Sequence, residues 1–122
     1  MAYFYSIRGW LEVEPEKFEK AIACLKYLQE IQLPETKAAL YLRGWCWQKQ
    51  PINWTRYLFY GADVSEEGLE LFKKTLLELL GLDLNLSGYF HAQGEDGENN
   101  LIYQITDDCL QLESGKMLVA VT

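Results

Sequence analysis

The chain contains one histidine and three cysteines, the side chains best suited to acid-base or nucleophilic chemistry. His91 lies in a segment, YFHAQ (residues 89–93), that alternates like a β-strand. General-base catalysis needs a carboxylate to orient the imidazole and a nucleophile within hydrogen-bond reach, and no spacing brings Cys46 or Cys109 to His91. One histidine with scattered cysteines also lacks the spacing of a zinc site. We therefore expect no catalytic residue, metal or cofactor, and interpret His91 as a partly exposed structural residue or a member of a polar pocket.

An acidic run, EDGENN (residues 95–100), offers the oxygen ligands that calcium prefers. It does not match the twelve-residue EF-hand pattern, because it lacks acidic residues at alternate positions and a closing bidentate glutamate. We expect a solvated hairpin loop at this position.

The side chains most typical of contact surfaces are tryptophan, tyrosine and arginine, which are enriched at the hot spots of protein interfaces. They occur at alternating positions in three stretches that are predicted as strands. If these sets share one face of a sheet, that face carries many aromatic rings interspersed with arginines. The residues expected on this interaction or ligand face are Arg8, Trp10, Tyr41, Arg43, Trp45, Trp47, Trp54 and Arg56.

Two other interpretations of this set stay open at the sequence level. Arginine stems and cation-π stacks can cover an ordinary half-exposed sheet without binding anything. Aromatic sheet faces also stack on single-stranded nucleic acid. The chain carries a net charge of −7 and no RNP-like motif, so nucleic-acid binding is disfavoured.

The elements that would position these residues follow from hydrophobic periodicity. Helical spacing of apolar residues predicts two helices, over 14–31 and 65–80, with Ser65 as a cap of the second. Alternation predicts strands, with a further hairpin and two short strands toward the C-terminus. The predicted strands span 3–13, 39–48, 54–64, 86–93, 101–106, 109–113 and 117–121.

The order β-α-β-β-α-β predicts an α+β fold of the ferredoxin-like, split βαβ type. We expect five to seven mostly antiparallel strands, with two helices packed on one face and the other face free. The stretches Arg8-Gly9-Trp10 and Arg43-Gly44-Trp45 echo each other. Their glycines are expected to form bulges or to make room for an aromatic neighbour on the adjacent strand.

Composition favours one domain, residues 1–122, with 49% hydrophobic and 14% aromatic residues. Charge is uneven: residues 1–60 carry eight Lys and Arg against six Asp and Glu, whereas residues 61–113 carry two against twelve. No apolar run has the roughly 20 residues that span a bilayer, and the N-terminus does not resemble a secretory signal. With an odd number of widely spaced cysteines, we expect a cytoplasmic protein.

These observations predict a small protein-interaction domain rather than an enzyme. It would dimerise through the aromatic face or a strand edge, or present its acidic half to a basic protein partner; inhibitor and immunity proteins resemble it in composition only. The alternative is a small-ligand or enzyme domain whose pocket holds an anion. The residues expected to line that pocket are Trp10, Tyr41, Arg43, Trp45, Arg56 and His91.

Overall fold

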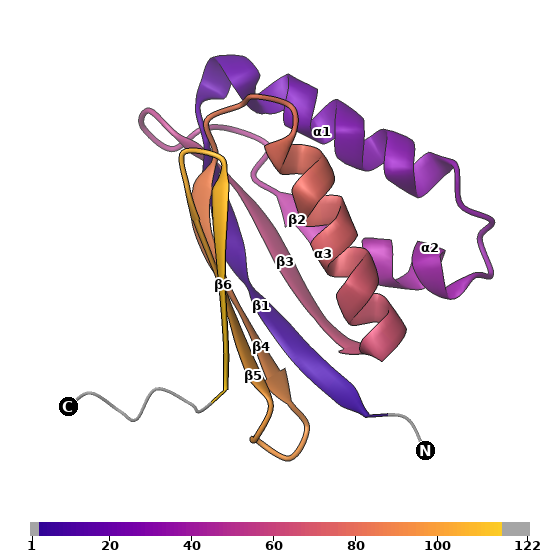
Figure 1. Cartoon of the computed structure of the whole chain (residues 1–122). Helices are drawn as coiled ribbons and strands as arrows, with labels where there is room; N and C mark the ends of the chain where they lie inside the picture. The colour runs from indigo at the N-terminus through magenta and orange to yellow at the C-terminus, as the bar shows by residue number, and fades with distance from the viewer. Residues whose placement is uncertain (1–2, 116–122) are drawn as a thin grey trace.

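The computed structural model describes residues 3–115 as an α+β fold with one open sheet (Figure 1). All three helices lie on the same side of this sheet (Figure 1). The strands are β1 (Phe4–Val13), β2 (Trp45–Trp47), β3 (Arg56–Ser65), β4 (Ser87–Gly94), β5 (Asn100–Thr106) and β6 (Cys109–Gly115). The helices are α1 (Pro15–Glu30), α2 (Lys37–Leu42) and α3 (Glu66–Leu80).

The six strands lie in the order β2-β3-β1-β4-β5-β6, and every neighbouring pair is antiparallel. Strand β3 separates β1 from β2, which are connected through α1 and α2. Strand β1 separates β3 from β4, which are connected through α3. The α+β class and the antiparallel sheet are confirmed. The order of the whole sheet is not that of a ferredoxin-like fold, because β5 and β6 extend it and an additional helix precedes β2, so the ferredoxin-like topology is not confirmed.

The predicted second strand, 39–48, is wrong over its first half, where the chain forms helix α2. Thr36 caps this helix, since its hydroxyl accepts a hydrogen bond from the amide of Ala39 at 3.2 Å. The residues that follow the cap include two alanines and two leucines, which are strong helix formers. Three helices therefore cover the sheet rather than the two expected.

The two long helices form for the reasons that the sequence indicates. Pro15 starts α1, whose buried residues Phe18, Ala21, Ile22 and Leu25 recur at helical spacing. Ser65 caps α3, with its hydroxyl accepting from the amide of Gly68 at 3.4 Å. The buried apolar residues of α1 and of α3 belong to one core with those of the sheet.

The core between helices and sheet is rich in aromatic rings. Phe72 of α3 is packed against Phe90 and Tyr60 at ring-centroid distances of 5.0 Å each. The ring of Phe90 lies over Gly9 of β1, and the ring of Tyr60 lies beside Gly44, where a Cβ atom on either glycine would collide with it. The prediction that these glycines make room for aromatic neighbours is confirmed.

The C-terminal strands β5 and β6 are joined by a tight turn at Asp107 and Asp108, which both have positive φ. The Asp108 carboxylate accepts hydrogen bonds from the amides of Asn85 and Leu86 at 2.9 and 2.7 Å, so the turn also fixes the approach to β4. The predicted strand 109–113 is confirmed as part of β6. The predicted strand 117–121 lies outside the described residues. Among residues 3–115, no helix has the length and apolar character needed to cross a membrane.

Candidate functional site

The sheet has one side that no described helix or strand covers, and we call this side the open face. Arg8 and Trp10 of β1 lie on it, because their neighbours Ile7 and Leu11 point into the core with no exposed surface. Of the eight residues predicted to share one surface, only these two lie on the open face. The other six lie in the core, around a groove beside α2, and in the connection between β2 and β3.

Trp45 and Tyr41 are core residues, so they cannot act on an exposed sheet face. Trp45 is 3% exposed and pairs with Tyr60, which also points toward the helices. Its ring stacks on Phe72 at 5.7 Å. The Tyr41 hydroxyl donates to the Ser65 hydroxyl oxygen and accepts from the Ser65 amide, both at 3.3 Å, which fixes α2 to the start of α3.

Arg56 is a structural clamp. Its Nη2 donates to the carbonyl oxygens of Gln48 and Lys49 at 2.6 and 2.7 Å. Its guanidinium carbon lies 3.7 Å from the centre of the Phe18 ring, and Glu19 lies 3.7 Å from Nη1. The side chain is 12% exposed and connects the β2-β3 loop to α1, so it is neither part of an open aromatic face nor a member of the predicted pocket.

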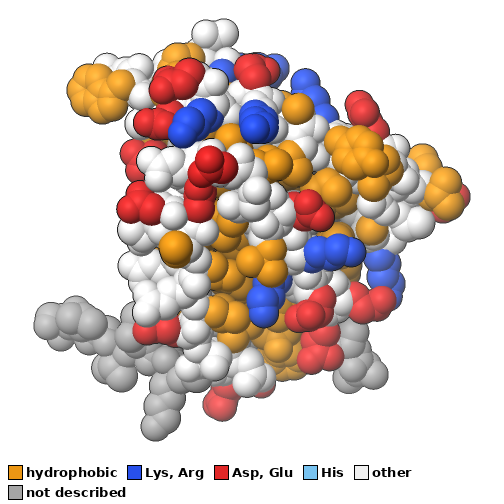
Figure 2. Space-filling model, turned by 45° about the horizontal axis from the view of Figure 1, so that its top comes forward, with side chains coloured by type: hydrophobic (Ala, Val, Ile, Leu, Met, Phe, Trp, Pro, Cys, Tyr) orange, Lys and Arg blue, Asp and Glu red, His pale blue; other side chains and the backbone are white. Residues whose placement is uncertain are grey.

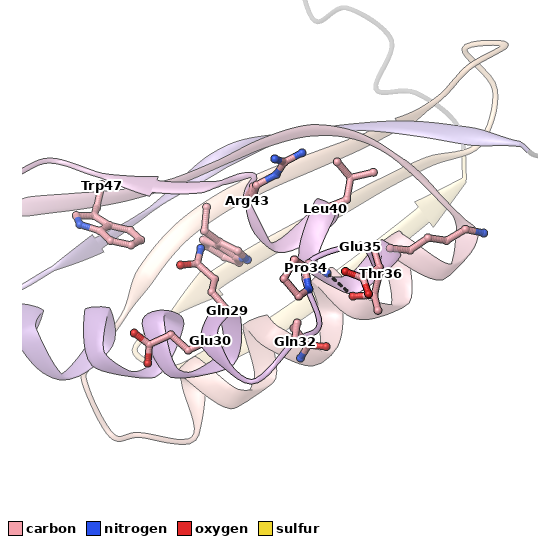
Figure 3. Close-up of a pocket in the computed structure, with 12 residues that line it drawn as sticks. Gln29, Glu30, Gln32, Pro34, Glu35, Thr36, Leu40, Arg43 and Trp47 are labelled. Carbon is pink, nitrogen blue, oxygen red and sulfur yellow. Dashed lines mark hydrogen bonds between the residues drawn. The ribbon is translucent and has the colours of Figure 1, made fainter.

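Trp54 is 79% exposed in the connection between β2 and β3, two residues before Arg56 and outside the strands of the sheet. Arg43 and Trp47 line a groove of about 850 Å³ that also includes Trp45. In Figure 3, Gln29 and Glu30 belong to α1, Leu40 belongs to α2, and Arg43 directly follows α2. Arg43, Trp45 and Trp47 therefore do come together, but at the helical side of the sheet.

His91 lies on the open face, opposite Arg8 in the β1-β4 register. Its Nε2 is 2.7 Å from the side-chain oxygen of Asn100, a buried residue whose amide nitrogen donates to the carbonyl of Gly97 at 3.1 Å. Cys46 and Cys109 are in β2 and β6, separated from β4 by at least one strand. His91 therefore supports the β4-β5 hairpin, as the structural interpretation predicts, and it has no adjacent thiol.

The open face carries an aromatic row that the sequence interpretation missed in part. Phe59 of β3 and Tyr89 of β4 are the register partners of Trp10 on its two sides. Trp10 is 42% and Phe59 37% exposed, and the Trp10 and Tyr89 rings are 5.7 Å apart. Tyr57 extends the row, with its ring 6.1 Å from that of Phe59.

The signal that identifies the missing residues is the alternation of β3. The predicted contact face includes Trp54 and Arg56, which places the even positions of β3 outward, yet Leu58 and Tyr60 at even positions are buried on the core side together with Val64. The apolar residues at even positions of β3 indicate that the odd positions, Tyr57 and Phe59, point outward. The strand was assigned correctly and its facing was inverted.

Two opposite charges flank Trp10 on the open face. Arg8 precedes it by two residues and Glu12 follows it by two, so both side chains share its face. Arg8 donates to the side-chain oxygen of Gln93 at 3.2 Å. Neither Arg8 nor Glu12 forms an ion pair with any residue of the described range 3–115.

The acidic loop between β4 and β5 uses its carboxylates within the fold. Glu95 accepts a hydrogen bond from the amide of Phe4 at 2.7 Å, and Asp96 accepts from the hydroxyl of Tyr3. The bond from Tyr3 lowers the pKa of the Asp96 carboxyl and raises the pKa of the Tyr3 hydroxyl. The loop therefore attaches the hairpin to the start of β1. Within residues 3–115 no group of three or more His, Cys, Asp or Glu side chains is placed to hold a metal ion.

Comparison with known proteins provides no family for this chain: no family model, curated protein or solved structure matches it.

Proposed function

We propose that the protein is an interaction domain that associates with a second copy of itself through the open face. The observation that carries this proposal is the aromatic row on a sheet side that no described element covers, in which Phe59 and Trp10 are exposed and Tyr89 is half-buried. Contiguous exposed aromatic surface is uncommon on monomeric proteins and is typical of contact sites. Pairing two such faces buries the rings as sheets do in a β-sandwich.

A second copy fits this face better than a basic partner does. The charges beside Trp10 are one arginine and one glutamate, so the centre of the face is electrically balanced. In the view of Figure 2, acidic side chains are interspersed with Lys and Arg rather than gathered into a patch of one sign. On the side of the molecule that this view shows, the acidic residues therefore form no single patch that would favour a basic partner. Location in the cytoplasm stays a prediction.

The test replaces the exposed aromatic residues and measures molar mass. Trp10→Ser and Phe59→Ser are each expected to shift the protein to monomer in light scattering after gel filtration, without loss of secondary structure, since both rings are exposed. Trp54→Ser is the matched control, because Trp54 is also exposed but lies off the open face. Equal masses for all four proteins would contradict the proposal.

A second candidate function is suggested by the groove beside α2, whose lining includes a residue with an unsatisfied buried donor. The indole Nε1 of Trp45 is buried and has no hydrogen-bond partner within the described chain, which costs about 1–3 kcal/mol. Trp45 lines the groove together with Arg43, which forms no ion pair with a described residue. A small carboxylate with an apolar body would accept hydrogen bonds from Arg43 and pack on Trp47, and a small displacement of the groove wall would let it reach the buried indole N–H of Trp45.

The lining also favours one negative charge over two. Lys37 is paired with Glu67 at 3.1 Å, and Glu30 and Glu35 lie on the rim, so Arg43 is the one lining cation with no described acidic partner. We expect 3-phenylpropionate to shift the indole N–H resonance of Trp45 and the neutral 3-phenylpropanol to leave it unchanged. Trp54, outside the groove, is the internal control. An unmoved Trp45 resonance at millimolar ligand would exclude this second function.

A further inference from the structure

We propose that the two copies pack face to face about a two-fold axis that lies in the interface and crosses β1 at Trp10, perpendicular to the strands. This inference rests on the proposed self-association and specifies its geometry. When two identical sheets pack face to face about a two-fold axis in their interface, that axis has two simple directions: parallel to the strands or perpendicular to them. The side chains on the open face distinguish these choices.

The charges beside Trp10 select the axis across the strands. An axis along β1 leaves the position of each residue along the strand direction unchanged. Arg8 of one copy would then face Arg8 of the other, and Glu12 would face Glu12. An axis across β1 reverses the strand direction, so Arg8 faces Glu12 of the second copy on both sides of Trp10. Like charges in direct opposition are unfavourable in a desolvated contact, whereas opposite charges fix the register.

The shape of β3 agrees with this choice. Tyr57 is the register partner of Glu12, and Gly61 is the register partner of Arg8. The same rotation that brings Arg8 opposite Glu12 therefore brings Tyr57 opposite Gly61 of the second copy. Gly61 has open space where a Cβ atom would be, with no atom within 4 Å. A half-buried tyrosine ring on the open face thus meets a position with no side chain, which is the complementarity that a two-fold contact requires.

The size of the open face is compatible with a stable dimer. Six strands spaced by about 4.8 Å and about eight residues long cover a surface of roughly 24 by 27 Å. This is on the order of the ~800 Å² per partner that a standard interface buries. The edges of the face hold one exposed cysteine each, Cys46 in β2 and Cys109 in β6.

The two cysteines report on the axis because the rotation treats them differently. Cys46 is the register partner of Phe59, so it lies in the same cross-strand row as Trp10. The rotation therefore places Cys46 of one copy opposite Cys46 of the second copy. Cys109 pairs with Thr106, and the rotation places it opposite Glu113 instead. The two Cys109 residues are then displaced by about four residues, or roughly 14 Å along the strand, in addition to the separation of about 10 Å between the sheets.

The experiment uses the full chain in two variants, one that keeps only Cys46 (C24A/C109A) and one that keeps only Cys109 (C24A/C46A). Each is treated with a bifunctional maleimide that spans about 10 Å, the separation of stacked sheets, and the products are resolved on a denaturing gel. Covalent dimer from the Cys46 chain and none from the Cys109 chain is the expected result. Light scattering on both variants, before the linker is added, establishes whether they associate.

Two outcomes would overturn the axis while leaving self-association intact: a dimer in light scattering that does not cross-link through Cys46, or one that cross-links equally through Cys109. A monomer in light scattering would instead contradict the proposed function itself.

Charge exchange provides an independent test of register. Arg8→Glu is expected to weaken association about tenfold, because it opposes Glu12 of the second copy, and R8E/E12R is expected to restore it. A double variant as weak as the single variant would overturn the register.

Discussion

At the scale of single residues, the two Arg-Gly-Trp stretches show that register decides what a side chain does. Trp10 belongs to a strand whose core residues are Ile7 and Leu11, so it points outward. Trp45 follows a helix and pairs with Tyr60, so it points inward. Similar local sequence thus produces one contact residue and one core residue, because each strand takes its facing from the apolar residues around it.

Glycines at two positions of the sheet provide a matched pair of substitutions. A Cβ atom on Gly9 would collide with the carbonyl oxygen of Tyr89 and the ring of Phe90, whereas one on Gly61 meets nothing within 4 Å. We expect Gly9→Ala to lower the free energy of unfolding by about 1–3 kcal/mol. In the dissociated monomer, where no second copy lies against Gly61, we expect Gly61→Ala to change this free energy by less than about 0.5 kcal/mol. Urea denaturation of the two variants measures this difference. Equal stabilities would show that Phe90 does not require the space above Gly9.

Stability at alkaline pH is predicted to depend on a buried tyrosine. Burial, with a smaller contribution from Glu70, raises the pKa of Tyr103 to about 12. An unfolded chain loses this proton near pH 10, so above that pH the unfolded state binds fewer protons and the free energy of unfolding falls as pH rises. The stabilisation is complete below about pH 10 and is lost progressively toward pH 12.

Replacing Tyr103 by Phe removes this titration, and no described residue hydrogen-bonds the hydroxyl that is lost. The free energy of unfolding, measured by urea denaturation between about pH 9 and about pH 11.5, should therefore fall less steeply with pH in Tyr103→Phe than in the wild type. The two slopes should differ by up to roughly 1.4 kcal/mol per pH unit. Tyr60, whose pKa burial also raises, remains in both proteins. Parallel pH profiles would refute the contribution of Tyr103.

At the scale of elements, the β2-β3 connection is fixed by Arg56 rather than by its backbone alone. We expect Arg56→Lys to cost about 1–3 kcal/mol although the charge is kept, because an ammonium cannot donate to both carbonyls while it stacks on Phe18. Arg43→Lys, at an exposed residue, is the control and should change stability by less than about 0.5 kcal/mol. Chemical denaturation compares the two, and similar small losses would mean that the clamp is dispensable.

The sequence predicts the long elements well and the short ones poorly. The stripe of Phe18, Ala21, Ile22 and Leu25 identifies α1 because it keeps helical spacing over about two turns of a 16-residue helix. Helix α2 has six residues, too few for periodicity to separate it from a strand, and the alternating positions 41, 43, 45 and 47 imitate β-structure across its end. The sequence predicts an open face, but Trp10 is the one member of its aromatic row that the prediction includes. Tyr57 and Phe59 are missed because the facing of β3 depends on which residues its neighbours bury.

At the scale of the whole molecule, self-association brings together two chains of net charge −7. Long-range repulsion between them is screened by salt, while the burial of aromatic rings is not weakened by it. The charges of Arg8 and Glu12 are desolvated in the contact, so salt screens their pairing less than it screens exposed charges. We therefore expect the dimer to persist at high ionic strength, which a contact made mainly of ion pairs would not.

The most direct test of the open face as a self-association surface is sedimentation equilibrium of the wild-type chain across a concentration series, at low and at high salt. The structure predicts a mass that rises with concentration toward twice that of the 14.2 kDa chain at both ionic strengths, and a Trp10→Ser variant that stays near the monomer mass. A wild-type protein that remains a monomer at every concentration would contradict the claim that this face binds a second copy.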